Sequence, residues 1–172
     1  ERSRGLGDVY KRQPNMEVFF HGGISFEPYR DQYKALIPSD RMHYMETYNA
    51  SEGFFGLQDN PEEHSLLLMI DYSVFYEFIP INEVGEEHPT VLPLEAVEVG
   101  KNYAMVITTS GGLWRYQIGD TVRFTSLYPH KFVISGRTKN FINAFGEELM
   151  VDNADKAISR VCRQTGAKVK EY

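Results

Sequence analysis

The sequence is poor in the residues that mark several common classes of protein. Its 172 residues include a single cysteine, Cys162, so no disulfide can form within the chain. No apolar run approaches the roughly 20 residues that cross a bilayer, and no signal-like apolar segment stands at the start. These absences predict a reducing, cytoplasmic setting and no membrane partner.

Basic residues are also outnumbered. The 18 lysines and arginines face 24 aspartates and glutamates, which gives a net charge of −6. Nucleic-acid backbones are bound by clustered Lys and Arg, so we expect no nucleic-acid partner, although a local anion site is compatible with this balance. The five histidines lack the paired spacing of a transition-metal site, and no G-x-S-x-G segment marks a serine nucleophile.

What the sequence does have is a large share of apolar residues, 42%, and of aromatic residues, 13%, which predicts a packed globular body. Residues 1–13, ERSRGLGDVYKRQ, show neither strand nor helix periodicity and are interpreted as a linker or a non-native leader. After them, MEVFFH has the length of a strand, Gly22 and Gly23 suit a turn, and FEPYRDQYKALIP suits a short helix.

Strand patterns dominate the middle of the chain, and loop signals separate most of them. The expected strands are HYMETYNA, SLLLMIDY, VFYEFIP, NYAMVITT, LWRYQI, DTVRFTS and HKFVISG. Such a series predicts antiparallel strands that close into a barrel or a curved sheet. VDNADKAISRVCRQTG then has helical periodicity, with Asp152 or Asn153 as its cap, and AKVKEY has the pattern of a strand.

The fold class predicted from these patterns is mixed α/β. Residues 14–138 would form a β-barrel-like antiparallel subdomain, and residues 139–172 would form a hinge and the start of a small α/β C-terminal domain. An unpaired strand at the end would leave an open edge, so we interpret the sequence as a fragment of a longer protein.

The stretch YNASEGFFG, from Tyr48 to Gly56, places a hydroxyl and a carboxylate between small residues at the end of a strand. Small residues expose the backbone to a flat ligand, and Glu52 could reach a hydrated divalent cation, which prefers oxygen ligands. The alternative is an ordinary turn in which Ser51 bonds locally and Glu52 is solvated. Taken alone, the residues favour the turn.

Two later segments offer partners for a nucleotide. Asp120 follows Gly119 at an expected strand junction, where a fixed carboxylate can accept both hydroxyls of a ribose, and the alternative is again a β-turn. Arg137 in ISGRTKNF offers a planar cation for a phosphate or carboxylate, with Lys139 beside it. Most such clusters are solvated surface.

The order of the motifs is more specific than any one of them. HGG, TYNASEGFFG, YEFIP, GLWRYQIGD and ISGRTKNFINAFGEEL together resemble the auxin-responsive acyl-acid amido synthetases, members of the adenylate-forming, firefly-luciferase-like superfamily. The resemblance runs from about Pro14 to the last residue. It implies a ligase that uses ATP and Mg²⁺ to activate a carboxylic acid as an acyl-adenylate, and then transfers the acyl group to an amino acid as an amide.

The resemblance also implies roles for individual residues. Asp120 would hold the ribose, and Glu52 would sit by the magnesium. Arg137 would approach the nucleotide sugar, and Lys139 with Asn140 would form the hinge between domains. The adenine and α-phosphate side would be lined by Gly22, Gly23, Thr47, Tyr48, Asn49, Ala50 and Ser51.

Some features depart from the family pattern. The serine-, glycine- and threonine-rich phosphate loop that the family places upstream is not in this sequence, so we expect the chain alone to bind nucleotide poorly. Asn49 and the segment ISGRTKNF favour a microbial branch over a plant hormone enzyme, so the expected acyl substrate is an organic acid that is not assigned to auxin or jasmonate. Two alternatives stay open: transfer of the acyl group to a thiol such as coenzyme A, and a non-catalytic β-barrel that binds a protein or small ligand.

Overall fold

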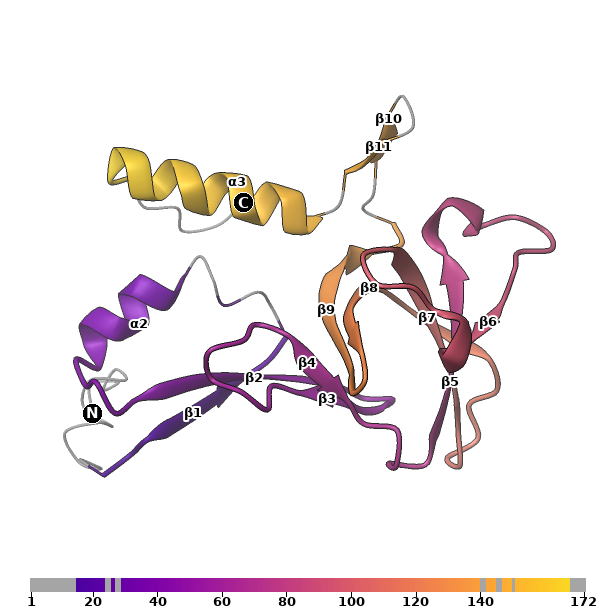
Figure 1. Ribbon diagram of the computed structural model, residues 1–172, viewed down its shortest axis with the longest axis horizontal. Helices are drawn as coiled ribbons and strands as arrows, with labels where there is room; N and C mark the ends of the chain where they lie inside the picture. The colour runs from indigo at the N-terminus through magenta and orange to yellow at the C-terminus, as the bar shows by residue number, and fades with distance from the viewer. Residues whose placement is uncertain are drawn as a thin grey trace, which may run out of the picture.

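A computed structural model describes residues 15–23, 26, 29–139, 142–144, 147–149 and 151–167. The predicted leader and most of the final predicted strand, residues 168–172, lie outside this part of the chain. The described residues form a mixed α/β structure that is dominated by one large sheet (Figure 1), and the predicted fold class is thereby confirmed.

Nine strands form this sheet, in the order β1-β2-β3-β4-β9-β8-β7-β5-β6. The sheet is curled but open among the described residues, because β1 and β6 lie at its two ends and do not pair. The predicted curved sheet is therefore correct, and closure into a barrel is not observed. The strands are β1 Val18–His21, β2 His43–Ala50, β3 Gly53–Leu57, β4 Leu66–Leu68, β5 Val74–Pro80, β6 Leu92–Pro93, β7 Asn102–Thr109, β8 Tyr116–Leu127 and β9 His130–Arg137.

One strand pair departs from the predicted antiparallel pattern. β1 and β2 are parallel, with His21 opposite Glu46, because the chain between them crosses over through the short helix α2, Arg30–Leu36. Phe19 and His21 face the side of the pair on which Phe26 and the helix residue Tyr33 pack. The alternate residues Val18 and Phe20 face the other way and are 42% and 56% exposed.

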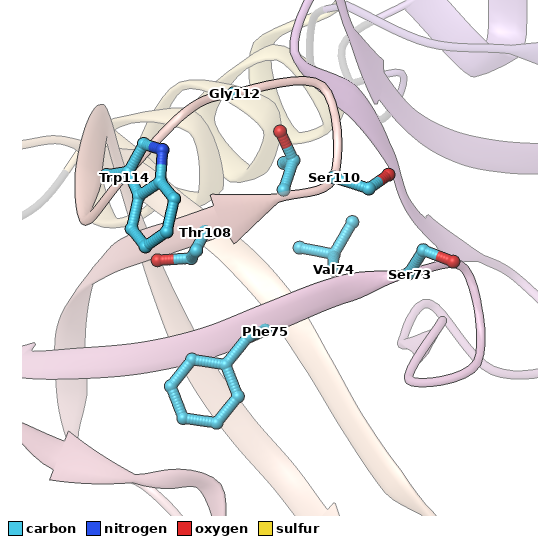
Figure 2. A pocket seen from close by; sticks show the side chains of 8 residues that line it. Ser73, Val74, Phe75, Thr108, Ser110, Gly112 and Trp114 are labelled. Atoms are coloured by element: carbon cyan, nitrogen blue, oxygen red, sulfur yellow. The ribbon is translucent and has the colours of Figure 1, made fainter.

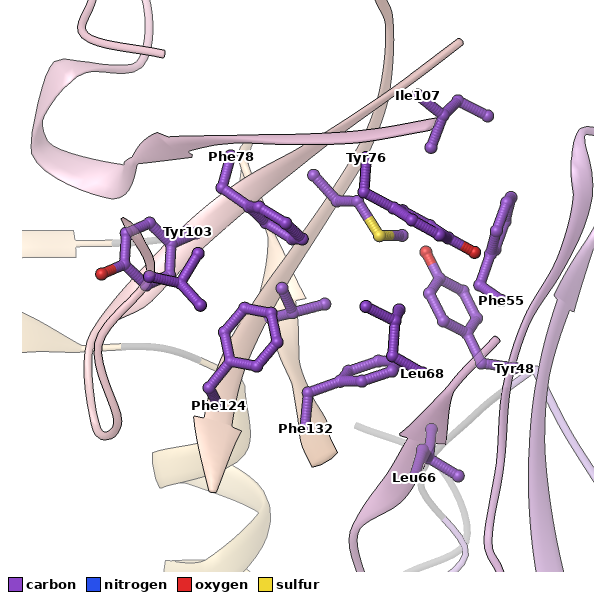
Figure 3. Packing of buried hydrophobic residues seen from close by; sticks show 13 residues of the cluster. Tyr48, Phe55, Leu66, Leu68, Tyr76, Phe78, Tyr103, Ile107, Phe124 and Phe132 are labelled. Carbon is purple, nitrogen blue, oxygen red and sulfur yellow. The ribbon is translucent and has the colours of Figure 1, made fainter. Parts of the chain in front are cut away.

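The main core fills the concave side of the curled sheet (Figure 3). β7 lies between β5 and β8 and is buried on both faces. Its residues Tyr103, Met105 and Ile107 join the main core, whereas Ala104 and Val106 pack under the segment that contains Val84 and Val91. This segment includes the short helix η2, Ile81–Glu83, and a second one, η3, Leu94–Ala96, follows β6. The buried residues of the main core are Tyr48, Phe55, Leu66, Leu68, Tyr76, Phe78, Val97, Tyr103, Met105, Ile107, Val122, Phe124 and Phe132.

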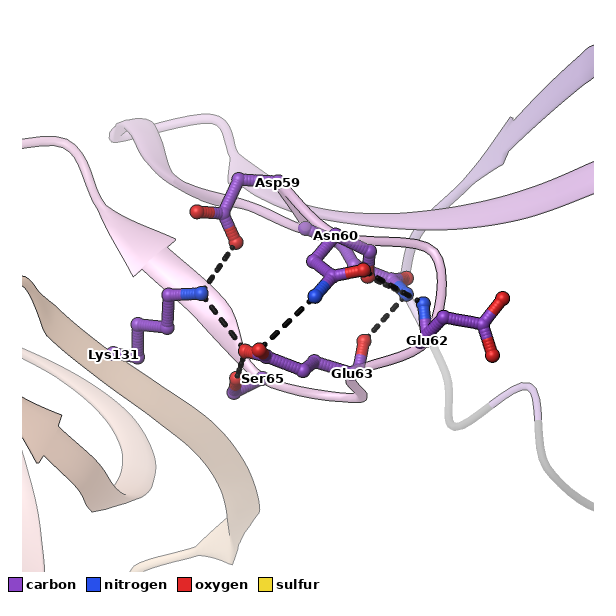
Figure 4. A network of polar contacts seen from close by, with 7 residues as sticks. Asp59, Asn60, Glu62, Glu63, Ser65 and Lys131 are labelled. Atoms are coloured by element: carbon purple, nitrogen blue, oxygen red, sulfur yellow. Dashed lines mark hydrogen bonds and ion pairs between the residues drawn. The ribbon is translucent and has the colours of Figure 1, made fainter.

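A network of hydrogen bonds and ion pairs holds the loop between β3 and β4 against β9 (Figure 4). The Lys131 amine lies 3.0 Å from Asp59 Oδ1 and 2.8 Å from Glu63 Oε2, and the lysine side chain is only 13% exposed. Gln58, which is buried, donates to the Glu63 carbonyl at 2.6 Å and accepts from the backbone N–H of Glu46 at 2.8 Å. The loop is thereby tied to both β2 and β9.

The C-terminal part contains a small antiparallel pair, β10 Ile142–Ala144 with β11 Glu147–Leu149, and the helix α3, Val151–Thr165. Because α3 begins at Val151, Asp152 and Asn153 belong to its first turn, and the predicted cap is wrong. The helix lies against β9 (Figure 1). A domain boundary at residue 139 stays a prediction. No helix in the described part of the chain combines the length and apolar character needed to cross a membrane.

Candidate functional site

Ser51 and Glu52 form the two-residue turn of the hairpin that joins β2 to β3, where Ala50 pairs with Gly53. The turn conformation considered for this motif is thus observed, and Glu52 is partly exposed in it. Just before the turn, the register shifts between Tyr48 and Asn49. Such β-bulges turn a side chain out of the regular alternation and are common beside active sites. The predicted motif therefore lies at an irregular strand end.

Gly22, the first residue of the predicted glycine pair, lies directly against this motif. The Thr47 hydroxyl donates to the His21 carbonyl at 3.2 Å, which joins the end of β1 to β2. A Cβ at Gly22 would stand only 2.8 Å from the Thr47 carbonyl oxygen, so only glycine permits this close approach. Gly23 has a φ of +95° and open space around it. Gly22 therefore borders the carboxyl-terminal half of β2, and no contact between Gly23 and β2 is seen among the described residues.

Asp120 lies inside a strand, which overturns both the predicted strand junction and the β-turn alternative. β8 runs without a break from Tyr116 to Leu127. Gly119 has a φ of +88°, and the register with β7 shifts next to it, so Gly119 and Asp120 form a bulge rather than a turn. Thr138 closes the bulge, because its backbone N–H donates to the Gly119 carbonyl at 2.9 Å.

Tyr48, Asp120 and Arg137 meet at the concave side of the sheet. The Tyr48 hydroxyl donates to Asp120 Oδ2 at 2.6 Å, and Arg137 Nε lies 3.0 Å from Asp120 Oδ1. The strands β2 and β8 are separated in the sheet by β3, β4 and β9, so this contact exists only because the sheet curls. The Asp120 side chain is 17% exposed and the Arg137 side chain 61%. Three of the sequence motifs thus converge on one carboxylate.

Glu52 lies close enough to the Tyr48 hydroxyl for its charge to act on it. Burial, the hydrogen bond to Asp120 and the charge of Asp120 raise the pKa of Tyr48 well above its usual value, with Arg137 opposing and the negative charge of Glu52 adding to the rise. The Tyr48 hydroxyl therefore stays protonated and donates. The charges of Asp120 and Glu52 thus both act on the Tyr48 hydroxyl. Among the described residues, no group of three or more metal-ligating side chains is found around Glu52 or elsewhere.

A second group of ionisable residues lies behind the motif, on the side of α2. Burial raises the pKa of Glu46 to about 7, and the charge of Arg30 opposes this rise. Burial, with Arg30 adding, lowers the pKa of His21 to about 4. The His21 ring stacks on Phe26 with centroids 4.0 Å apart, and its buried Nε2 has no hydrogen-bond partner among the described residues.

These two shifts predict opposing effects of pH on stability. Glu46 contributes stability that is fully present below its ordinary pKa of 4.5 and is lost as the pH rises through about 7. His21 contributes stability that is present above pH 6.5 and is lost as the pH falls through about 4. Glu46→Gln should therefore gain stability relative to wild type as the pH rises from 4.5 to 7, measured by urea unfolding. Glu95→Gln, on the exposed surface, controls for the lost charge, and parallel profiles for Glu46→Gln and wild type would contradict the assignment.

Two predicted residues lie at the margin of the site. Lys139 is exposed in the turn after β9, and its predicted hinge partner Asn140 lies outside the described residues. Ala50 is exposed at the end of β2. Two features were not predicted from the sequence. One is the role of Thr138, which stands between Arg137 and Lys139 and closes the bulge. The other is the hydrogen bond between Tyr48 and Asp120.

Two surface hollows lie away from these residues. The first, of about 510 Å³, is formed around the start of β5, the end of β7 and the following turn (Figure 2), and the exposed side chains of Phe75 and Trp114 contribute to it. The second, of about 440 Å³, contains Arg115 and His88 among its lining residues. Neither is lined by a residue predicted to bind nucleotide.

Comparison with known proteins identifies the family. Residues 67–137 match the GH3 family central domain. The chain is 32% identical to the indole-3-acetic acid-amido synthetase GH3.4 of Arabidopsis thaliana, over 96% of the chain and 30% of that protein. It is 34% identical to GH3.3 of the same plant, over 96% of the chain and 29% of that protein. The chain belongs to the GH3 family.

The structural comparison agrees with the GH3 assignment. The solved structure of the AtGH3.15 acyl acid amido synthetase in complex with 2,4-DB superimposes with a TM-score of 0.66 at 21% identity, over 89% of this chain and 27% of that one. This likeness shows that the chain shares the fold of the matching part of that structure. The chain spans about a third of the length of its curated GH3 relatives, and the microbial branch stays a prediction.

Proposed function

We propose that this chain is part of an enzyme that activates a carboxylic acid with ATP and then joins the acyl group to an amino acid through an amide bond. In the first step a carboxylate oxygen of the acid attacks the α-phosphorus of ATP, and pyrophosphate leaves. In the second step the amine nitrogen attacks the acyl carbon, AMP leaves, and the nitrogen gives up a proton. The names of the GH3 relatives, which are amido synthetases, support this reaction class.

The observation that carries the proposal is the convergence of Tyr48, Asp120 and Arg137. The three residues come from three separate sequence motifs, and Asp120 is held at 2.6 Å and 3.0 Å by the other two. A carboxylate that is fixed in this way can accept the two hydroxyls of a ribose. Gly22, Gly23 and the segment from Thr47 to Ser51 are proposed to border the base and the α-phosphate.

Glu52 fits the role of a magnesium ligand. Mg²⁺ keeps several water molecules and binds through one or two carboxylates together with substrate phosphates, so a single partly exposed carboxylate at a turn is sufficient. The ion would neutralise charge on the phosphates as pyrophosphate leaves. Arg137 and Lys139 are proposed to contribute positive charge next to the sugar and at the start of the C-terminal segment, where a domain hinge is proposed.

The proposal is tested by the exchange of labelled pyrophosphate into ATP, measured on the full-length polypeptide that carries this chain. We expect exchange that depends on an added organic acid, and amide products on addition of amino acids, detected by mass spectrometry. Thioester formation with coenzyme A in place of amide formation would favour the thiol alternative. The absence of exchange with every acid in a broad panel would contradict adenylation altogether.

A further inference from the structure

Asp120 is held from two sides by groups of different kinds. The Tyr48 hydroxyl, which is buried, donates to Oδ2 at 2.6 Å, and the more exposed Arg137 side chain meets Oδ1 at 3.0 Å. An ionised carboxylate has about four lone-pair positions, two on each oxygen. Each oxygen of Asp120 is thus left with one acceptor position that neither residue uses.

One free acceptor position on each oxygen matches a vicinal diol, which donates two parallel hydrogen bonds. A carboxylate that rotates freely would bind a single hydroxyl almost as well, because it could turn either oxygen toward that donor. Selectivity for two neighbouring hydroxyls therefore requires that the plane of the carboxylate is fixed. In this chain the fixing groups are Tyr48 and Arg137.

Tyr48 is better suited than Arg137 to fix this plane. Its ring is 6% exposed and packs against Phe55, at a centroid distance of 5.1 Å, and against Phe132, at 6.1 Å. The hydroxyl position is therefore set by the core of the sheet. Arg137, with a side chain that is 61% exposed, can move away without disturbing the core.

We propose that Tyr48 is a positioning residue that acts through Asp120 and makes the nucleotide site selective for a ribose over a deoxyribose. The inference rests on the proposed function, because it assumes that Asp120 receives the sugar of ATP. It assigns to the Tyr48 hydroxyl a role distinct from lining the base, because the hydroxyl acts on the sugar through Asp120.

The test compares ATP with 2′-deoxy-ATP and 3′-deoxy-ATP in pyrophosphate exchange, using the full-length polypeptide. Wild type should prefer ATP over both deoxy forms. In Tyr48→Phe the ratio of kcat/KM for ATP to that for each deoxy nucleotide should fall about tenfold, the size expected for one lost hydrogen bond to a charged group. The activity with the deoxy nucleotides should change much less than the activity with ATP.

Tyr76→Phe is the matched control. Tyr76 is 4% exposed, belongs to the same core and contacts the same Phe55 ring, but its hydroxyl donates to the Met69 carbonyl at 3.1 Å. Its loss should leave the ATP preference unchanged. If Tyr48→Phe does not fold, Phe55→Leu tests the same role, because it loosens the packing at 5.1 Å that holds the Tyr48 ring, and it too should lower the preference.

The possible outcomes separate the two proposals. An equal loss with all three nucleotides in Tyr48→Phe, with the preference intact, would overturn the positioning role and leave adenylation standing. If Phe55→Leu is the only variant that folds, an unchanged preference in it would overturn the positioning role of Tyr48. A wild-type protein that shows no exchange, or no preference for ATP, would instead overturn the proposed nucleotide site on which the inference rests.

Discussion

Asp120→Asn is expected to lower the rate of ATP-pyrophosphate exchange by about 100-fold or more, which corresponds to roughly 3 kcal/mol. The amide keeps the shape of the carboxylate but replaces one acceptor oxygen with a donor. It therefore cannot satisfy Tyr48, Arg137 and two sugar hydroxyls together. The measurement is steady-state exchange in the full-length polypeptide, accompanied by thermal unfolding to confirm that the variant is folded.

The chain offers a close control for this variant. Arg115 Nε lies 3.0 Å from Glu77 Oε2, with side chains that are 61% and 18% exposed, so this pair nearly repeats the geometry of Arg137 with Asp120. Glu77→Gln removes an equivalent ion pair away from the proposed site and should leave exchange unchanged. A similar loss of activity in both variants would show that Asp120 acts through the sheet and not through the nucleotide.

Phe78→Ala is expected to destabilise the chain by about 3–5 kcal/mol, the range for deleting a buried phenylalanine side chain. Phe78 is fully buried and contacts Phe124, at a centroid distance of 5.1 Å, and Tyr103, at 6.2 Å. Its removal leaves a cavity in the main core. Because a folded domain is only marginally stable, a loss of this size is a large share of its free energy of unfolding. Urea unfolding followed by tryptophan fluorescence or circular dichroism would measure the loss.

Phe75→Ala, on the same strand, is the matched control for this core variant. Phe75 is 62% exposed on the outer face of β5, so its truncation should change stability by less than about 0.5 kcal/mol. If the two variants lost similar stability, β5 would not be oriented with Phe78 toward the core. A second explanation for the same result would be that Phe75 is buried in an interface that the described residues do not show.

The strands were predictable where local residue patterns decide the structure. NYAMVITT and VFYEFIP are rich in β-branched and aromatic residues, and they form β7 and β5 with the expected bounds. β8 was divided in two at Gly119 because a glycine followed by an aspartate has the same sequence signature in a turn and in a bulge. Only the pairing with β7 and β9 distinguishes them, and pairing is not local.

The candidate site was predictable in its members and not in its connections. The order of the motifs predicted Tyr48, Asp120 and Arg137 as site residues. The hydrogen bond between Tyr48 and Asp120, however, joins positions that are 72 apart in the sequence. It depends on the curvature of the whole sheet, which no single segment encodes. The parallel pairing of β1 with β2 was missed for a similar reason, because it follows from the crossover through α2.

The end strand β1 has a practical consequence for handling the protein. Along its outer side no other strand supplies hydrogen bonds within the described part of the chain, and Val18 and Phe20 present apolar side chains to solvent beside it. A polypeptide produced with this strand uncovered offers a template on which a second copy can add, which promotes aggregation. Expression trials that extend the N-terminal side, or place a lysine at position 20, address this hazard directly.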